Sequence, residues 1–142
     1  MTFEVRVQRE VFVLDVEYRK LMGINDKTGA LVSFSGLVRD APLELEHYPG
    51  MAERQMQAVL DAARGRWPLL GSIIVHRYGL LAVGDPIVLV LTASSHRAEA
   101  FAAADFLMDW LKTRAPFWKK ATEGWVNAKV SDDLAARRWD IK

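Results

Sequence analysis

A proline divides the segment from residue 112 to residue 120 and determines where the secondary structure must change. The segment reads Lys-Thr-Arg-Ala-Pro-Phe-Trp-Lys-Lys. Pro116 has no backbone N–H and disfavours helical geometry in the residue before it, so a helix that approaches this segment must end near Arg114. The sequence therefore predicts that Lys112 lies in a last helical turn and that Lys119 lies on an extended segment after it.

The same segment is basic and aromatic, and two interpretations of it are open. Two lysines on two elements that meet at a corner can bind a small anionic substrate. Alternatively, the corner is an ordinary surface feature, where the lysines extend into water and Phe117 and Trp118 belong to the core. Residue types alone favour the surface interpretation.

The composition is that of one globular domain spanning residues 1–142. Apolar residues make up 51% and charged residues 26% of the chain, which is ordinary for a folded domain with a real core. The formal net charge of +1 provides no field that would attract nucleic acid or an anionic membrane. Between Trp110 and Lys129, however, basic residues outnumber the single acid, Glu123, which favours a local anion site.

Several classes of site are excluded by residue types. The chain has no cysteine, which excludes disulfides, thiolate zinc sites, a cysteine nucleophile and a persulfide on this chain. It also has no phosphate-binding glycine loop, no zinc-ligand spacing and no Gly-x-Ser-x-Gly motif. We therefore expect neither a metal nor a cofactor, and the sequence does not favour a phosphate-ester hydrolase.

Targeting signals are also missing from the sequence pattern. Charged residues interrupt the apolar residues near Met1, unlike in a signal peptide. The longest apolar run, near Pro86–Ala93, is too short to span a bilayer. The expected location is the cytoplasm, with no membrane partner.

Hydrophobic periodicity predicts alternating strands and helices along the chain. We expect strands over 3–8, 30–38, 43–48, 72–78, 86–94 and 125–130, and helices over 15–22, 50–66, 96–114 and 132–139. Asp15 is the expected N-cap of the first helix, Gly36 marks a bulge or a close backbone approach, and 79–85 is a turn. This order predicts an α+β fold with packed helices and a mostly antiparallel sheet.

A second candidate anion site lies where a strand precedes the long helix, at Ser95-His96-Arg97. Free N–H groups and the helix dipole favour an anion there, although a capped helix start with exposed side chains is common.

Arg97 and Lys112 are fifteen residues apart on one helix, so about 22 Å separates them. One small substrate cannot contact both in a single chain. If both residues serve one site, a second copy of the chain must supply one of them.

Two further residues have weaker signals. Met108 lies four residues before Lys112, so its thioether can line the same pocket, although a core position is the stronger interpretation. His76, inside a predicted strand, is interpreted as structural. A single-strand nucleic-acid binder that uses the basic and aromatic corner is a further alternative, and the near-neutral charge counts against it.

Several short segments between residues 29 and 130 follow one another in a characteristic order. They are Gly29-Ala30 leading to Phe34–Arg39, then Leu45–Ala52, His76–Gly79, Ser95–Arg97 with Ala100-Phe101, Met108-Asp109 with Leu111-Lys112, and Ala115–Lys119. As an ordered set they resemble the family of large, catalytic subunits of molybdopterin synthase. The resemblance implies an α/β-hammerhead-like fold.

The resemblance also implies an activity and an assembly. The family is a sulfurtransferase of molybdenum-cofactor biosynthesis that converts cyclic pyranopterin monophosphate (precursor Z) to molybdopterin by installing a dithiolene. The sulfur arrives as a C-terminal thiocarboxylate on a small ubiquitin-like subunit. The family forms a central homodimer of large subunits within a heterotetramer, which agrees with the spacing argument.

By resemblance, Lys112 lies nearest the thiocarboxylate and Lys119 lies beside the pterin, and the two share acid–base and charge-stabilising roles. The implied substrate-binding set also comprises Phe34, Leu37, Val38, Arg39, His96, Arg97, Met108 and Lys120. Within it, Arg39, His96 and Arg97 hold the phosphate, the last two from the neighbouring subunit. Leu37 and Val38 offer backbone contacts, while Phe34 and Met108 shape the pocket.

The sequence departs from the family pattern in three places. The segment 40–44 is shorter than the usual glycine-containing loop, Ala121 stands where an acid is usual (Glu123 is a candidate substitute), and Leu37 stands where a basic residue is common. A loop this short would alter docking of the small partner or closure of the pocket. The alternative function is therefore a non-catalytic member of the same fold that binds the small partner or a pterin without turnover.

Overall fold

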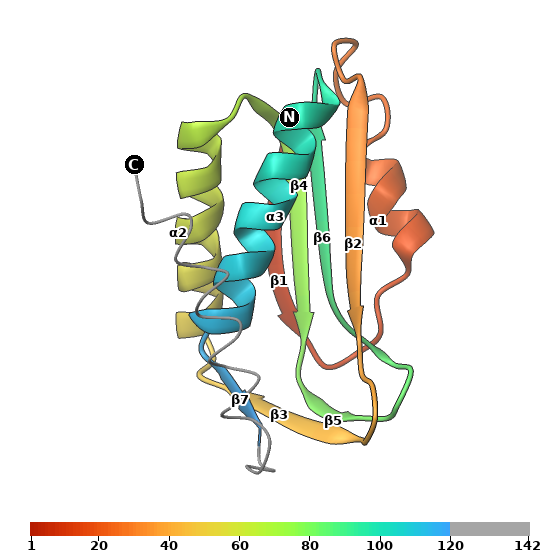
Figure 1. Ribbon diagram of the computed structural model, residues 1–142, viewed down its shortest axis with the longest axis vertical. Coiled ribbons are helices and arrows are strands. Elements are labelled where there is room, and N and C mark those ends of the chain that lie inside the picture. The colour runs from red at the N-terminus through yellow and green to blue at the C-terminus, as the bar shows by residue number, and fades with distance from the viewer. Residues whose placement is uncertain (120–142) are drawn as a thin grey trace.

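The computed structural model describes residues 1–119, which form two sheets and three helices (Figure 1). The elements follow in the order β1 (Thr2–Gln8), α1 (Leu14–Leu21), β2 (Ala30–Leu37), β3 (Leu43–His47), α2 (Met51–Arg66), β4 (Leu69–Arg77), β5 (Gly79–Leu81), β6 (Pro86–Ser94), α3 (Arg97–Thr113) and β7 (Phe117–Lys119). The α+β fold predicted from the sequence is confirmed. The predicted strand over 125–130 and the helix over 132–139 lie outside the described residues.

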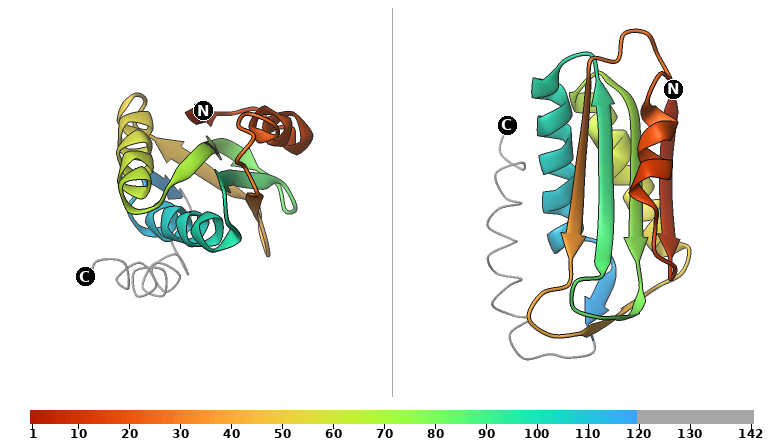
Figure 2. Two further views of the ribbon diagram at one scale, coloured as in Figure 1. Left: turned by 90° about the horizontal axis from the view of Figure 1, so that it is seen from above. Right: turned by 90° about the vertical axis from the view of Figure 1, so that its right-hand side faces the viewer.

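The larger sheet, called the main sheet below, has four strands in the order β1-β4-β6-β2. Only β1 and β4 run parallel, while β4–β6 and β6–β2 are antiparallel. The small sheet has the antiparallel order β5-β3-β7. Figure 2 shows α2 and α3 on one face of the main sheet and α1 on the other. The predicted preference for antiparallel pairing is therefore confirmed.

Helices on both faces explain why β4 and β6 are almost continuously apolar. Successive side chains of a strand point to opposite faces. Ile74 and Val90 pack with buried residues of α2 and α3, whereas Ile73 and Leu91 pack with Leu21 of α1. A strand that is buried on both faces needs an apolar residue at nearly every position.

An ion-pair cluster fixes α1 to the edge of the main sheet. Arg6 on β1 donates to both carboxylate oxygens of the buried Glu17, at 3.1 and 2.5 Å, and Lys20 donates to the same carboxylate at 3.1 Å. Burial alone would raise the pKa of Glu17, but the hydrogen bonds from Arg6 and Lys20 outweigh it and lower this pKa.

The predicted N-cap role of Asp15 is wrong. Val13 occupies the cap position without a side-chain bond, and Asp15 pairs with Arg19 inside the helix.

The long helix α3 ends where the proline requires. Its last residue is Thr113, and Arg114 is the C-cap, with its N–H bonded to the carbonyl of Trp110 at 2.8 Å. The extended segment after Pro116 forms β7, which pairs with β3. The predicted positions of Lys112 in the last turn and Lys119 on an extended segment are both confirmed.

The predicted turn over 79–85 includes a short strand, β5, that the sequence pattern did not reveal. Gly79 has φ of +95° and pairs with Leu45 of β3. As in β7, three residues are too few to show a periodic pattern. Both strands form because β3 pairs with each of them.

The helix α2 begins as predicted, immediately after Pro49-Gly50. Gly50 lies at the N-cap with φ of +81°, and its N–H donates to the Glu53 carboxylate at 2.9 Å. Among residues 1–119, none of the helices combines the length and the apolar character needed to cross a membrane.

Candidate active site

Lys112 and Lys119, called the lysine pair below, lie at the end of the main sheet that carries the small sheet (Figure 1). Lys112 is exposed in the last turn of α3, and Lys119 is half-buried on β7. Residues i and i+2 of a strand share a face, so Lys119 lies on the same face of the small sheet as Phe117. The link from α3 to β7 therefore brings both amines to one corner.

Two aromatic rings connect this corner to the main sheet. The imidazole of His76, at the end of β4, stacks on the ring of Phe117 with centroids 3.7 Å apart and planes 11° apart. His47 of β3 lies on Phe117 as well, at 5.7 Å and 22°. Aromatic contacts of this kind stabilise by about 1 kcal/mol each beyond the area that they bury. They hold β3, β4 and β7 together next to Lys112.

His76 is a buried, neutral histidine, with only 7% of its surface exposed. Burial lowers its pKa to about 4, and the nearby charges of His47 and Lys112 act in the same direction. Its Nδ1 lies 2.8 Å from the carbonyl oxygen of Arg77. That carbonyl can only accept, so Nδ1 carries the proton of the neutral ring. Sequence reasoning interpreted His76 as structural, and a histidine within an otherwise apolar strand was the available signal of its position at the site.

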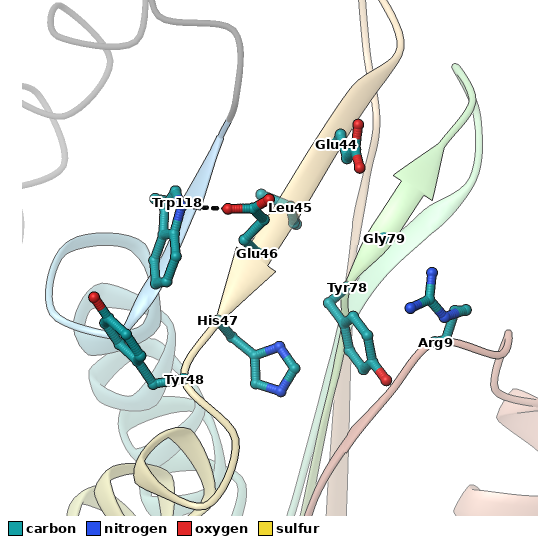
Figure 3. Close-up of a pocket in the computed structure, with 9 residues that line it drawn as sticks. All are labelled: Arg9, Glu44, Leu45, Glu46, His47, Tyr48, Tyr78, Gly79 and Trp118. Carbon is teal, nitrogen blue, oxygen red and sulfur yellow. Dashed lines mark hydrogen bonds between the residues drawn. The ribbon is translucent and has the colours of Figure 1, made fainter.

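A pocket of about 340 Å³ opens beside β3 (Figure 3). Its lining comes from the segment after β1, from β3, from the β4–β5 junction and from β7, and comprises Arg9, Glu44, Leu45, Glu46, His47, Tyr48, Tyr78, Gly79 and Trp118. The Trp118 indole N–H donates to the Glu46 carboxylate at 3.0 Å. Trp118 lies between Phe117 and Lys119 on β7, so its side chain points to the opposite face of the small sheet. The pocket therefore borders the corner without including the lysine pair.

The end of β2 reaches the same end of the main sheet. The predicted irregularity at Gly36 is confirmed, because the register with β6 shifts between Gly36 and Leu37. The side chains of Phe34 and Leu37 are exposed there. Val38 is buried instead. Its N–H donates to the Asp85 carbonyl, and its carbonyl accepts from the Gly84 N–H. Both backbone groups of Val38 are therefore bonded to the adjoining turn.

Arg39 follows this strand with its side chain 92% exposed, and within residues 1–119 its ion pair is a long one, 3.9 Å, to Asp40. Ion pairs between exposed side chains stabilise little. Asp40 has φ of +72°, a left-handed conformation that Asp adopts more readily than most residues. The guanidinium of Arg39 is thus held only weakly and can turn toward an anion.

His96 and Arg97 lie at the opposite end of α3 (Figure 1). His96 is the N-cap, makes no side-chain capping bond, and is exposed, as is Arg97. With α3 intact between them, these residues and Lys112 cannot meet in one chain. The lysine pair and the end of β2 thus lie toward one end of the main sheet, and His96 and Arg97 lie toward the other end (Figure 1).

The start of α3 depends on a close backbone contact. The N–H of Gly29 donates to the Ser94 carbonyl at 3.1 Å, and a Cβ on Gly29 would lie 2.3 Å from the Ser95 carbonyl oxygen. We expect Gly29→Ala to displace Ser95, to destabilise the fold by about 1–3 kcal/mol, and to weaken binding of an anion at His96 and Arg97. Thermal unfolding and the KM for substrate measure the two effects.

The matched control for this substitution is Gly65→Ala, since a Cβ at Gly65 in α2 has no neighbour within 4 Å. Alanine is the better helix former there, so this variant should be at least as stable as the parent. A Gly29→Ala protein that matches the parent in stability and KM would contradict the proposed contact.

Two further residues of the predicted set differ in their outcome. Met108 is 9% exposed and belongs to the core cluster with Leu111, which confirms the core position that the residue pattern favoured. Met108 lies one helical turn before Lys112 and anchors that part of α3 in the core. Lys120 lies outside the described residues.

The arrangement suits anion binding and proton transfer. Two amines and a neutral imidazole lie at the corner, and ammonium groups can both donate protons and stabilise developing negative charge. The exposed guanidinium of Arg39 lies toward the same end of the main sheet. Among residues 1–119, no group of His, Cys, Asp and Glu side chains is placed to hold a metal ion.

Comparison with known proteins assigns the family. The model of the MoaE protein family matches residues 7–114. The chain is 49% identical to the molybdopterin synthase catalytic subunit of Cereibacter sphaeroides, over 95% of this chain and 99% of that relative. A molybdopterin cofactor biosynthesis protein E from Burkholderia multivorans superposes with a TM-score of 0.88 at 48% identity, covering 100% of this chain and 99% of that one.

A more distant solved structure has the same fold. Molybdopterin synthase from Staphylococcus aureus superposes with a TM-score of 0.73 at 30% identity, over 83% of this chain and 91% of that one. The sequence match, the identity over nearly the full length and the shared fold lead to one assignment. This chain belongs to the MoaE protein family.

Proposed function

We propose that this chain is the catalytic subunit of a molybdopterin synthase, which inserts the dithiolene sulfurs that convert precursor Z to molybdopterin. The proposal is supported by the position of Lys112 in the last turn of α3 and of Lys119 on β7, the strand that follows it, in a chain 49% identical to a relative of that name. The whole chain, 1–142, acts as one domain in the cytoplasm.

In this proposal the two lysines have separate neighbours. Lys112, on the exposed last turn of α3, faces the thiocarboxylate of a small ubiquitin-like subunit, and Lys119 faces the pterin. Sulfur addition requires charge stabilisation at the thiocarboxylate and proton movement at the pterin carbon, and ammonium groups supply both. Arg39, exposed at the end of β2, turns toward the phosphate of the substrate.

The complete site requires two copies of the chain. The length of α3 keeps His96 and Arg97 about 22 Å from Lys112, so a neighbouring large subunit supplies them to hold the phosphate. The working assembly is then a homodimer of large subunits with a small subunit at each end.

The second candidate function is binding of the small subunit or of a pterin without turnover. The observation that favours it is the short, exposed segment after Arg39, where a longer loop would cover the site. A protein that cannot close its pocket should still bind its partner.

The experiment combines the purified protein, the thiocarboxylated small subunit and precursor Z, and measures molybdopterin as its fluorescent oxidation product. We expect product only when all three components are present. The control replaces the thiocarboxylate with the ordinary carboxylate, which carries no transferable sulfur. Binding of the small subunit without product would support the non-catalytic alternative.

A further inference from the structure

A series of contacts between planar groups, some stacked and one tilted by 45°, passes near Lys112. In order it comprises His76, Phe117, His47, Tyr78 and Arg9, and it is called the ring stack below. The distances from ring to ring are 3.7, 5.7 and 4.3 Å, and the Arg9 guanidinium carbon lies 4.9 Å from the Tyr78 centroid. The stack joins the end of β4 to β3 and β7, so it connects the main sheet to the small sheet.

We propose that His76 is a positioning residue for the sulfur-transfer reaction: by stacking on Phe117 it fixes β7, and thereby the position of Lys119 relative to Lys112. The proposal rests on the proposed function. It assigns a role in turnover to a buried side chain that does not itself contact the substrate.

The short strand β7 depends on this contact. It has three residues and pairs with β3 at three positions. Pro116, immediately before it, has no N–H to donate, and the N–H of Phe117 is used locally by the carbonyl of Ala115 at 2.8 Å. The ring of Phe117 contacts the main sheet directly through His76 and also packs against the core cluster.

His76, in contrast, occupies a rigid part of the fold. β4 lies between β1 and β6, and His76 pairs with Val7 on one side and Val88 on the other. Its Nδ1–H bond to the Arg77 carbonyl sets the rotation of the ring. Arg77 is fixed in turn by its own bonds to the Arg9 and Pro86 carbonyls, at 2.9 to 3.1 Å. Phe117 thus stacks on a ring that cannot easily turn.

The neutral state of the imidazole suits this position. With a pKa of about 4, the ring remains uncharged at neutral pH. A protonated ring would place a second positive charge beside Lys112, at a buried position where charge is costly. His76 therefore provides a flat surface and one hydrogen bond without repelling the cation that the reaction needs.

Two substitutions separate the ring from its hydrogen bond. His76→Asn removes the ring and keeps an N–H close to the Nδ1 position, whereas His76→Phe keeps a stacking ring and removes the donor. Because a displacement of about 1 Å in a reacting group can cost roughly a hundredfold in rate, we expect kcat to fall roughly ten- to a hundredfold in the Asn variant. The Phe variant should retain kcat within about threefold, and the KM for precursor Z should be unchanged in both.

Ser72→Ala is the matched control for loss of buried packing. Ser72 lies on the same strand and the same face as His76, about 13 Å away along β4, and it donates a buried hydrogen bond to the Leu91 carbonyl at 2.7 Å. This variant should lose thermal stability and keep kcat. The assay uses the full chain with saturating thiocarboxylated small subunit.

The possible outcomes are distinct. Loss of kcat in the Asn variant, with rescue by Phe and no loss in Ser72→Ala, supports the positioning role. The positioning role is overturned if the Asn variant and the parent have equal kcat. It is also overturned if the loss of kcat is proportional to the loss of thermal stability in all three variants, His76→Asn, His76→Phe and Ser72→Ala. If the parent chain itself makes no product, the proposed function fails and this role fails with it.

Discussion

Replacement of either Lys112 or Lys119 by alanine is expected to reduce turnover on the order of 10²- to 10⁴-fold, the usual range for a group that transfers protons in the transition state. Lys112 is exposed on α3 and Lys119 ends β7, and in the proposed mechanism they act on the two different reactants. Neither amine can replace the other, so each single variant should lose activity.

The measurement is the single-turnover rate of molybdopterin formation with thiocarboxylated small subunit in excess. Arg19→Ala is the control, because Arg19 is exposed on α1, which covers the face of the main sheet opposite α3 (Figure 2). The Lys112→Ala protein should unfold at the temperature of the parent, since exposed side chains contribute little to stability. Near-normal turnover in either lysine variant would remove that lysine from the mechanism.

The long elements of this fold are predictable because their signals are local. Apolar side chains at helical spacing mark α2 and α3, and Pro116 fixes the end of α3 through its missing N–H. The Asp15 prediction was wrong because an ion pair with Arg19 competes with capping. The strands β5 and β7 have three residues each, and they exist because β3 pairs with both, which no local pattern records.

Part of the candidate site was also predictable from local signals in the sequence. The positions of Lys112 and Lys119 on two elements follow from one proline, and Met108 was favoured as a core residue and lies in the core. His76 could not be placed at the corner from sequence, because its importance comes from a ring, Phe117, that is distant in the chain and close in space. Contacts of this kind require the three-dimensional arrangement of strands.

The proposed division of the site between two chains predicts the second large effect. Lys112→Ala and Arg97→Ala homodimers should both be nearly inactive, because each lacks one part of every site. A heterodimer of the two variants contains one site with both residues intact and one site with neither. It should therefore recover about half of the parental turnover per dimer, since the two sites of a twofold dimer are equivalent.

Two affinity tags on co-expressed variants allow the heterodimer to be purified, and its rate is compared with those of the homodimers. The control is the heterodimer of Lys112→Ala with Lys119→Ala. These residues lie at one corner of one chain, so every site in that heterodimer lacks a lysine and no activity should return. Recovery in the control, or its absence from the Arg97 pairing, would mean that the site is divided differently. Recovery in the Arg97 pairing alone would establish that the 17 residues of α3 span two active sites, one at each end.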